Sequence, residues 1–180
     1  MTWDAFHHRG DVLRSVVDEA NARRDGVLPM DLPGVAETFG DETALVAALQ
    51  LRWHTRLAGR IERSLMDRPD DLEAAVVSAW RGAAAELAGV REILDAHRAA
   101  PATPEMGAAL EKAHAKEAVL LAAMAGRAGA SDAAAVRLGE RIEEKARAAY
   151  DPTATPRHLR DDDDGHPAGL LGRLKAHLAA

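Results

Sequence analysis

The chain has 180 residues, of which 47% are hydrophobic and 29% charged, fractions near those of ordinary globular proteins, whereas only 3% are aromatic. A formal net charge of -6 disfavours a general attraction to nucleic-acid phosphates. The absence of cysteine excludes disulfides, thiolate catalysis and cysteine-bound metals. No apolar run approaches the roughly 18 residues of a membrane span, and no secretory signal opens the chain. We therefore expect a cytoplasmic protein without a membrane partner.

Apolar residues recur at steps of three and four through most of the chain, which predicts helices rather than strands. Turn and capping residues divide this pattern into five helices, over residues 2–24, 41–67, about 70–94, 104–126 and 131–150. Four caps are predicted, in chain order Asp41, Asp70 or Asp71, Thr103 followed by Pro104, and Ser131. Residues 27–40 contain two prolines and two glycines and are predicted to form an ordered, largely apolar loop.

The expected fold is thus all-α: one bundle domain of about five helices over residues 1–150. Residues 151–167 hold three prolines and the run Asp161–Asp164, which predicts a flexible acidic linker. Residues 168–180 form a predicted amphipathic helix with four leucines on one side: Leu170, Leu171, Leu174 and Leu178. These leucines would dock either on the bundle itself or in a groove of another chain. The leucine-bearing end loosely resembles the tails that load cargo into encapsulin shells.

One carboxylate falls on the apolar side of a predicted helix. A helical projection of residues 104–126 places Glu117 near the centre of the apolar stripe. Arg56 and Arg60 lie within or beside the apolar face of helix 41–67, so we predict an Arg–Glu pair between these two helices. Such a pair either fixes the packing of the helices or borders a pocket in which the spare arginine binds an anionic ligand.

A metal site is the second hypothesis. Glu111 and His114 have the Glu-x-x-His spacing and resemble the motif of ferritin-like di-iron proteins, which implies a metal bound inside the bundle. The motif occurs once in this chain rather than twice, and the projection turns Glu111 toward solvent. His54 and His97 could converge with His114 to bind zinc through three imidazoles, although no local spacing supports such a site.

The function that we predict is a non-enzymatic helical interaction or regulatory protein. It would bind another protein, or a second copy of itself, through the bundle surface or the C-terminal tail. The alternative is a ferritin-like or other bundle that binds a metal or a small ligand around Glu117, His114 and the two arginines. Neither a nucleophile elbow nor a glycine-rich phosphate loop with lysine occurs, which favours the non-enzymatic reading. The sequence identifies no cofactor.

Overall fold

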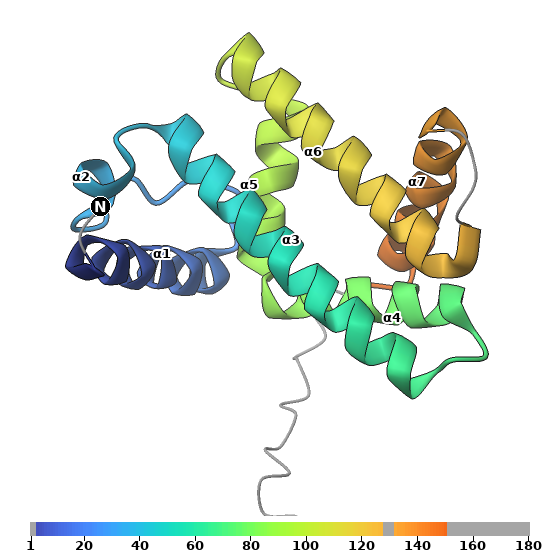
Figure 1. Ribbon diagram of the computed structural model, residues 1–180. Helices are drawn as coiled ribbons and strands as arrows, with labels where there is room; N and C mark the ends of the chain where they lie inside the picture. Colours follow the sequence, from blue (N-terminus) through green and yellow to red (C-terminus); the bar gives the residue numbers. More distant parts are fainter. Residues whose placement is uncertain (1–2, 128–131, 151–180) are drawn as a thin grey trace, which may run out of the picture.

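The computed structural model describes residues 3–127 and 132–150, and within these ranges the chain is helical without any strand (Figure 1). Its elements are α1 (Trp3–Arg23), α2 (Val35–Phe39), α3 (Glu42–Asp67), α4 (Leu72–Glu86), α5 (Ala88–Ala99), α6 (Pro104–Ala122), the π-helical turn η1 (Ala123–Arg127) and α7 (Asp132–Ala148). The predicted all-α bundle is therefore confirmed. None of these described helices combines the length and apolar composition needed to cross a membrane. The predicted linker and tail helix lie outside the described residues.

Three helix starts coincide with predicted caps, because each cap satisfies a backbone amide that has no partner inside the helix. The Asp41 carboxylate accepts from the Ala44 amide at 2.8 Å, and Asp71 accepts from Ala74 at 3.0 Å. The Thr103 hydroxyl accepts from the amide of Met106 at 3.1 Å. Ser131, the fourth predicted cap, lies outside the described residues.

The predicted loop 27–40 differs from expectation because it contains the short helix α2. Gly34 precedes this helix with φ of 81°, and Gly40 follows it with φ of 80°, a backbone region that favours glycine. Between them Val35 and Phe39 are buried. The helical turn thus removes these two apolar side chains from water.

The helix predicted from about residue 70 to 94 is also different, because the chain breaks at Leu87 into α4 and α5. Asn21 of α1 bonds to both sides of the break. Its side-chain nitrogen donates to the Glu86 carbonyl at 3.0 Å, and its oxygen accepts from the Gly89 amide at 3.0 Å. A side chain from α1 therefore replaces helical hydrogen bonds lost at the break. The periodicity of apolar residues in the sequence did not predict this break.

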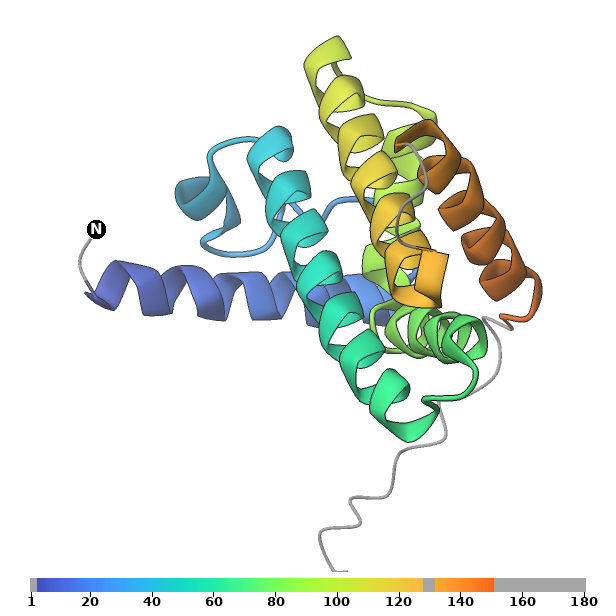
Figure 2. The same ribbon diagram turned by 45° about the vertical axis from the view of Figure 1, so that its right-hand side comes forward.

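The helices pack in crossing pairs. α3 packs on α4, α6 packs on α7, and α1 packs on α5, so that α1 and α2 lie at one side of the bundle and α7 at the other (Figure 1). The turned view shows α1 running across the direction of α3 (Figure 2). This leaves the N-terminal half of α3 and its neighbour α1 at the edge of the molecule, and the middle of α3, α5 and α6 at its centre.

Small residues allow two of these pairs to approach with their backbones in contact. A Cβ atom on Gly89 of α5 would lie 1.8 Å from the Ala20 carbonyl oxygen of α1. A Cβ on Gly139 of α7 would lie equally close to the Ala118 carbonyl of α6. Trp53 and Trp80, the two largest of the fully buried side chains, meet edge to face at 5.7 Å between ring centroids.

Candidate functional site: a buried glutamate and the pockets around it

Glu117 lies in the middle of the core, as its place on the apolar stripe of α6 predicted. The residue is 2% exposed, and both of its carboxylate oxygens accept a hydrogen bond from an indole. Trp53 Nε1 of α3 donates to Oε2 at 2.8 Å, and Trp80 Nε1 of α4 donates to Oε1 at 3.2 Å. One carboxylate thus ties three helices together and satisfies the polar atoms of both large core residues.

Glu117 is ionised in this position. Burial alone would raise its pKa, but the hydrogen bonds from His54 and Trp53 and the charge of Arg91 outweigh burial, so its pKa is lowered from the ordinary value of 4.5. His54 Nε2 lies 3.4 Å from Oε2, and Arg91 Nη1 of α5 lies 3.7 Å from the same oxygen. The Arg91 guanidinium also stacks on the Trp53 ring at 4.9 Å.

The charges continue from Glu117 toward α7. Arg91 donates to Asp95 at 2.6 Å, and Asp95 accepts two bonds from Arg147 of α7, each of 2.9 Å. Arg147 in turn donates to Glu143 at 2.8 Å and stacks on the Trp80 ring. Burial opposes both charges, yet the arginines lower the pKa of Asp95, and the two carboxylates raise the pKa of Arg147. Each member of this network therefore stabilises the charge of the next.

His114 lies at the α7 end of the network. Its Nδ1 is 3.5 Å from Glu143 Oε2, and its Nε2 is 4.0 Å from Glu140 Oε1. Together with Arg98, Glu144 and Arg147 these residues line a polar pocket of about 250 Å³. Glu143 Oε2 is buried and accepts no hydrogen bond from the described residues.

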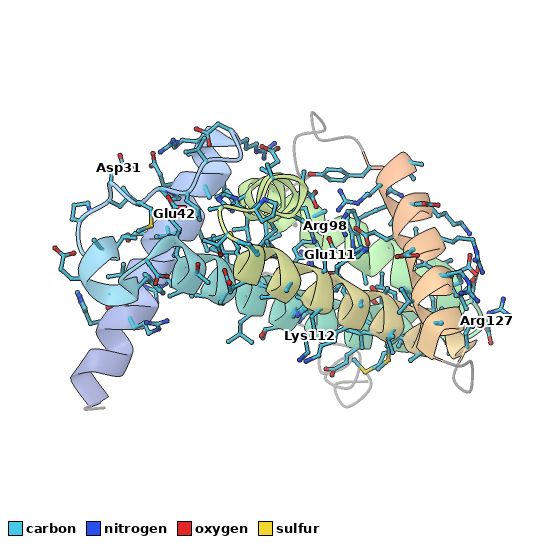
Figure 3. All side chains as sticks on the ribbon, turned by 90° about the horizontal axis from the view of Figure 1, so that it is seen from above. Asp31, Glu42, Arg98, Glu111, Lys112 and Arg127 are labelled. Atoms are coloured by element: carbon cyan, nitrogen blue, oxygen red, sulfur yellow. The ribbon has the colours of Figure 1, made fainter. Side chains whose placement is uncertain are left out.

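The candidate metal ligands His54, Glu111 and His114 have separate surroundings. His54 lies beside Glu117, and His114 lies beside Glu140 and Glu143. Glu111 is exposed, and it extends from a different side of α6 than its neighbour Lys112 (Figure 3). Over residues 3–127 and 132–150, no three His, Asp or Glu side chains form a group that could hold a metal ion. The Glu-x-x-His pair thus belongs to no metal-holding group in the described part of the chain.

The predicted pairing of Arg56 and Arg60 with Glu117 is wrong. Both arginines of α3 pair with Glu86 of α4, and Arg60 Nη2 donates to it at 2.7 Å. Burial would raise the pKa of Glu86, but the two arginines lower it. α4 packs along α3 and brings Glu86 to these arginines, whereas α5 supplies Arg91 as the cation near Glu117. Arg91 was missed, although a charged residue within the apolar repeat of Leu87, Val90 and Leu94 is a signal that could have identified it.

A second pocket opens next to the buried glutamate, between α3 and α6. It has a volume of about 330 Å³ and is lined by His54, Thr55, Ala58, Lys116, Glu117 and Leu120. His54 has a side chain 27% exposed and therefore separates Glu117 from solvent. This pocket combines an imidazole, an ammonium group and a short apolar surface.

Another depression, larger in volume than the two pockets above, is an apolar groove between α1 and α3, which we call the α1–α3 groove. Its volume is about 530 Å³, and it is lined by Arg9, Leu13, Ala44, Ala47, Ala48, Leu51, Arg52 and Thr55. Leu51 is 69% exposed there. Arg9 donates to the Thr38 carbonyl at 2.9 Å and lies over the Phe39 ring, so it is held at the groove. The four tail leucines predicted to dock a partner are outside the described residues.

The fold and its centre define an all-α helical bundle organised around a buried, ionised glutamate. Comparisons of the chain with protein-family models, curated proteins and solved structures find no match.

Proposed function

We propose that this protein is a non-enzymatic interaction protein that binds a partner protein in the α1–α3 groove. The observation that carries the proposal is the exposed apolar surface of this groove. Leu51 is 69% exposed, beside the half-buried Leu13 and a floor of three alanines. An exposed leucine in a concave apolar site loses contact with water when a partner side chain packs on it, which favours association.

The groove fits an amphipathic helix with acidic residues on its flank. Two neighbouring helices that diverge at the edge of a bundle leave room for the apolar face of a third helix. The charged groups lining the groove are Arg9 and Arg52, and Arg52 has no ion-pair partner among the described residues. A partner with Asp or Glu beside its apolar anchors would therefore meet complementary charge, which raises the rate of association and selects against basic helices.

Support for binding rather than catalysis comes from how the central charges are used. Glu117, Arg91, Asp95 and Arg147 are the partners of one another; the first two are buried and the last two are partly buried. Charges paired in this way hold helices in place and have little capacity left for a substrate.

Two exposed apolar residues on the same helix make a matched test. A photoreactive phenylalanine analogue is placed at Leu51 in the groove or at Met66, which is 75% exposed but outside it. After irradiation in cells that produce the full chain, mass spectrometry identifies the cross-linked peptides. The proposal expects position 51, and not position 66, to label an acidic amphipathic segment of one other protein. Labelling of residues 168–180, of a second copy of this chain, or of the same proteins from both positions would refute it.

Affinity for the identified segment then provides a second measurement. Leu51→Asp should weaken binding at least tenfold, because it removes an apolar anchor and repels an acidic partner. Met66→Asp adds the same charge to the same helix outside the groove and should leave binding unchanged. Equal affinities for the two variants would contradict the proposed site.

A further inference from the structure

His54 is oriented by the groups beneath it. Its Nε2 lies 3.4 Å from Glu117 Oε2 and 3.1 Å from the side-chain amide nitrogen of Gln50. An ionised carboxylate only accepts hydrogen bonds, so the proton of a neutral His54 belongs on Nε2. A half-turn of the Gln50 amide about its terminal bond places its oxygen toward the same proton. In this arrangement a buried carboxylate fixes the tautomer of the ring, as a carboxylate does for many functional histidines.

The other ring nitrogen is thereby left with a lone pair. His54 Nδ1 has no hydrogen-bond partner among the residues that the structure describes, and His54 lines the pocket between α3 and α6. Lys116 lines the same pocket, is exposed, and likewise has no partner in the described part of the chain. Thr55 contributes no free donor, since its hydroxyl donates to the Leu51 carbonyl at 2.9 Å.

The charged groups that line this pocket are the carboxylate of Glu117 and the ammonium group of Lys116. Arg91 lies 3.7 Å from the glutamate, and the imidazole of His54 adds a positive charge when it is protonated. Ala58 and Leu120 provide the apolar part of the lining. A volume of about 330 Å³ is at the lower end of the range for small-molecule pockets, about 300–1,000 Å³.

We infer that this pocket binds a small aliphatic carboxylate. One carboxylate oxygen of the ligand accepts from Nδ1 of protonated His54, the other accepts from Lys116, and the hydrocarbon chain lies against Ala58 and Leu120. The imidazolium then donates to two carboxylates at once, Nε2–H to Glu117 and Nδ1–H to the ligand. This site lies between α3 and α6 and does not depend on the partner proposed for the α1–α3 groove.

Binding of the anion takes up a proton whenever His54 is neutral beforehand. The charged groups that face His54 are Glu117 and Lys116 from α6, with Arg91 of α5 behind the glutamate. Loss of the imidazolium proton removes the Nδ1 donor. Affinity for the carboxylate should therefore be weaker at higher pH, where a neutral imidazole offers no proton on Nδ1.

Sodium hexanoate is a suitable probe, and 1-hexanol is its neutral counterpart. The full chain is titrated with each compound between pH 5.5 and 8, and the imidazole resonances of His54 are followed by NMR while calorimetry measures proton uptake. We expect hexanoate to shift the His54 resonances saturably, with proton uptake and weaker binding at higher pH. Equal binding of hexanol, a response without pH dependence, or no saturable shift of His54 would overturn the inference.

Three substitutions localise the response. His54→Gln should weaken hexanoate binding about tenfold or more, since it removes a charged hydrogen-bond donor. Lys116→Gln, at an exposed position where folding is not at risk, should weaken binding about twofold to fivefold, the effect of an exposed ion pair. Lys112 lies one turn earlier on the same helix and outside the pocket, so Lys112→Gln is the matched control. Equal affinities of the Lys116 and Lys112 variants would also overturn the inference.

Discussion

Replacing Glu117 with alanine tests whether the buried network stabilises the fold. The substitution leaves two indole donors, Trp53 Nε1 and Trp80 Nε1, without their acceptor in the core. It also leaves Arg91, 7% exposed, with Asp95 as its only nearby carboxylate among the described residues. Removal of one partner from a buried charge pair costs about 3–5 kcal/mol, so we expect a loss of that size in the free energy of unfolding.

This loss is large relative to the total free energy of unfolding of a single domain. Single domains unfold with a free energy of about 5–15 kcal/mol, so Glu117→Ala should lower the urea midpoint strongly and can leave part of the protein unfolded at room temperature. Fluorescence of Trp53 and Trp80 and far-ultraviolet circular dichroism report tertiary and helical structure respectively. Coincident transitions by both signals are needed before the two-state free energy is used.

Glu117→Gln removes the charge of this side chain but keeps its size and shape. The amide oxygen still accepts from one indole, but the amide nitrogen faces the other donor, which leaves one unsatisfied group at a cost of about 1–3 kcal/mol. The expected order of stability is therefore wild type, glutamine variant, alanine variant. A loss below about 1 kcal/mol for Glu117→Ala, the size typical of solvated pairs, would refute the argument that this carboxylate compensates buried donors and a buried cation.

The lowered carboxylate pKa values, the close contact between α6 and α7 and the ion pairs of Glu86 can each be tested by substitution. The pKa values of Glu117 and Asp95 are lower in the folded protein than their ordinary values. Each carboxylate therefore stabilises the fold fully above its ordinary pKa, and this contribution is lost as the pH falls through its pKa in the folded state. Because Glu117→Gln removes one of these carboxylates, its free energy of unfolding should depend less steeply on acid pH than that of the wild type. Gly139→Ala should destabilise by about 1–3 kcal/mol in urea unfolding, because its Cβ would meet a backbone carbonyl of α6, whereas Gly59→Ala, with open space around it, should be neutral or stabilising by up to about 1 kcal/mol. Glu86→Ala should cost under about 1 kcal/mol in the same assay, since Glu86 and its arginines are partly solvated, and a cost above about 2 kcal/mol would contradict this.

Local signals in the sequence predicted most of the helices and one member of the central site. The caps Asp41, Asp71 and Thr103 act within three residues of themselves, so their effect can be read from sequence alone. The burial of Glu117 could be predicted for a related reason, because the apolar stripe of a helix identifies its inner face wherever the helix packs.

Partners across helices could not be predicted in the same way. A helical projection shows that Arg56 and Arg60 lie near the apolar face of α3, but not which neighbouring helix faces them. Packing of α4 on that part of α3 gives them Glu86 instead of Glu117. The break at Leu87 escaped prediction because the side chain that stabilises it, Asn21, comes from another helix far away in sequence.

The alanine-rich composition and the buried network are physically connected. The backbones of two helices touch at Gly139 and Ala118. Small side chains at such a contact interlock weakly, so packing alone does little to favour one register of the two helices over the next. Directional bonds supply that distinction, since Glu117 meets both indoles, and Arg147 of α7 meets Asp95 of α5, in one arrangement. A sliding of α6 or α7 by one turn would leave several charges buried without partners, at a cost that apolar contacts do not offset. The network that fixes the helices also orients His54 at the edge of the pocket between α3 and α6, so the same carboxylate serves the fold and the proposed ligand site.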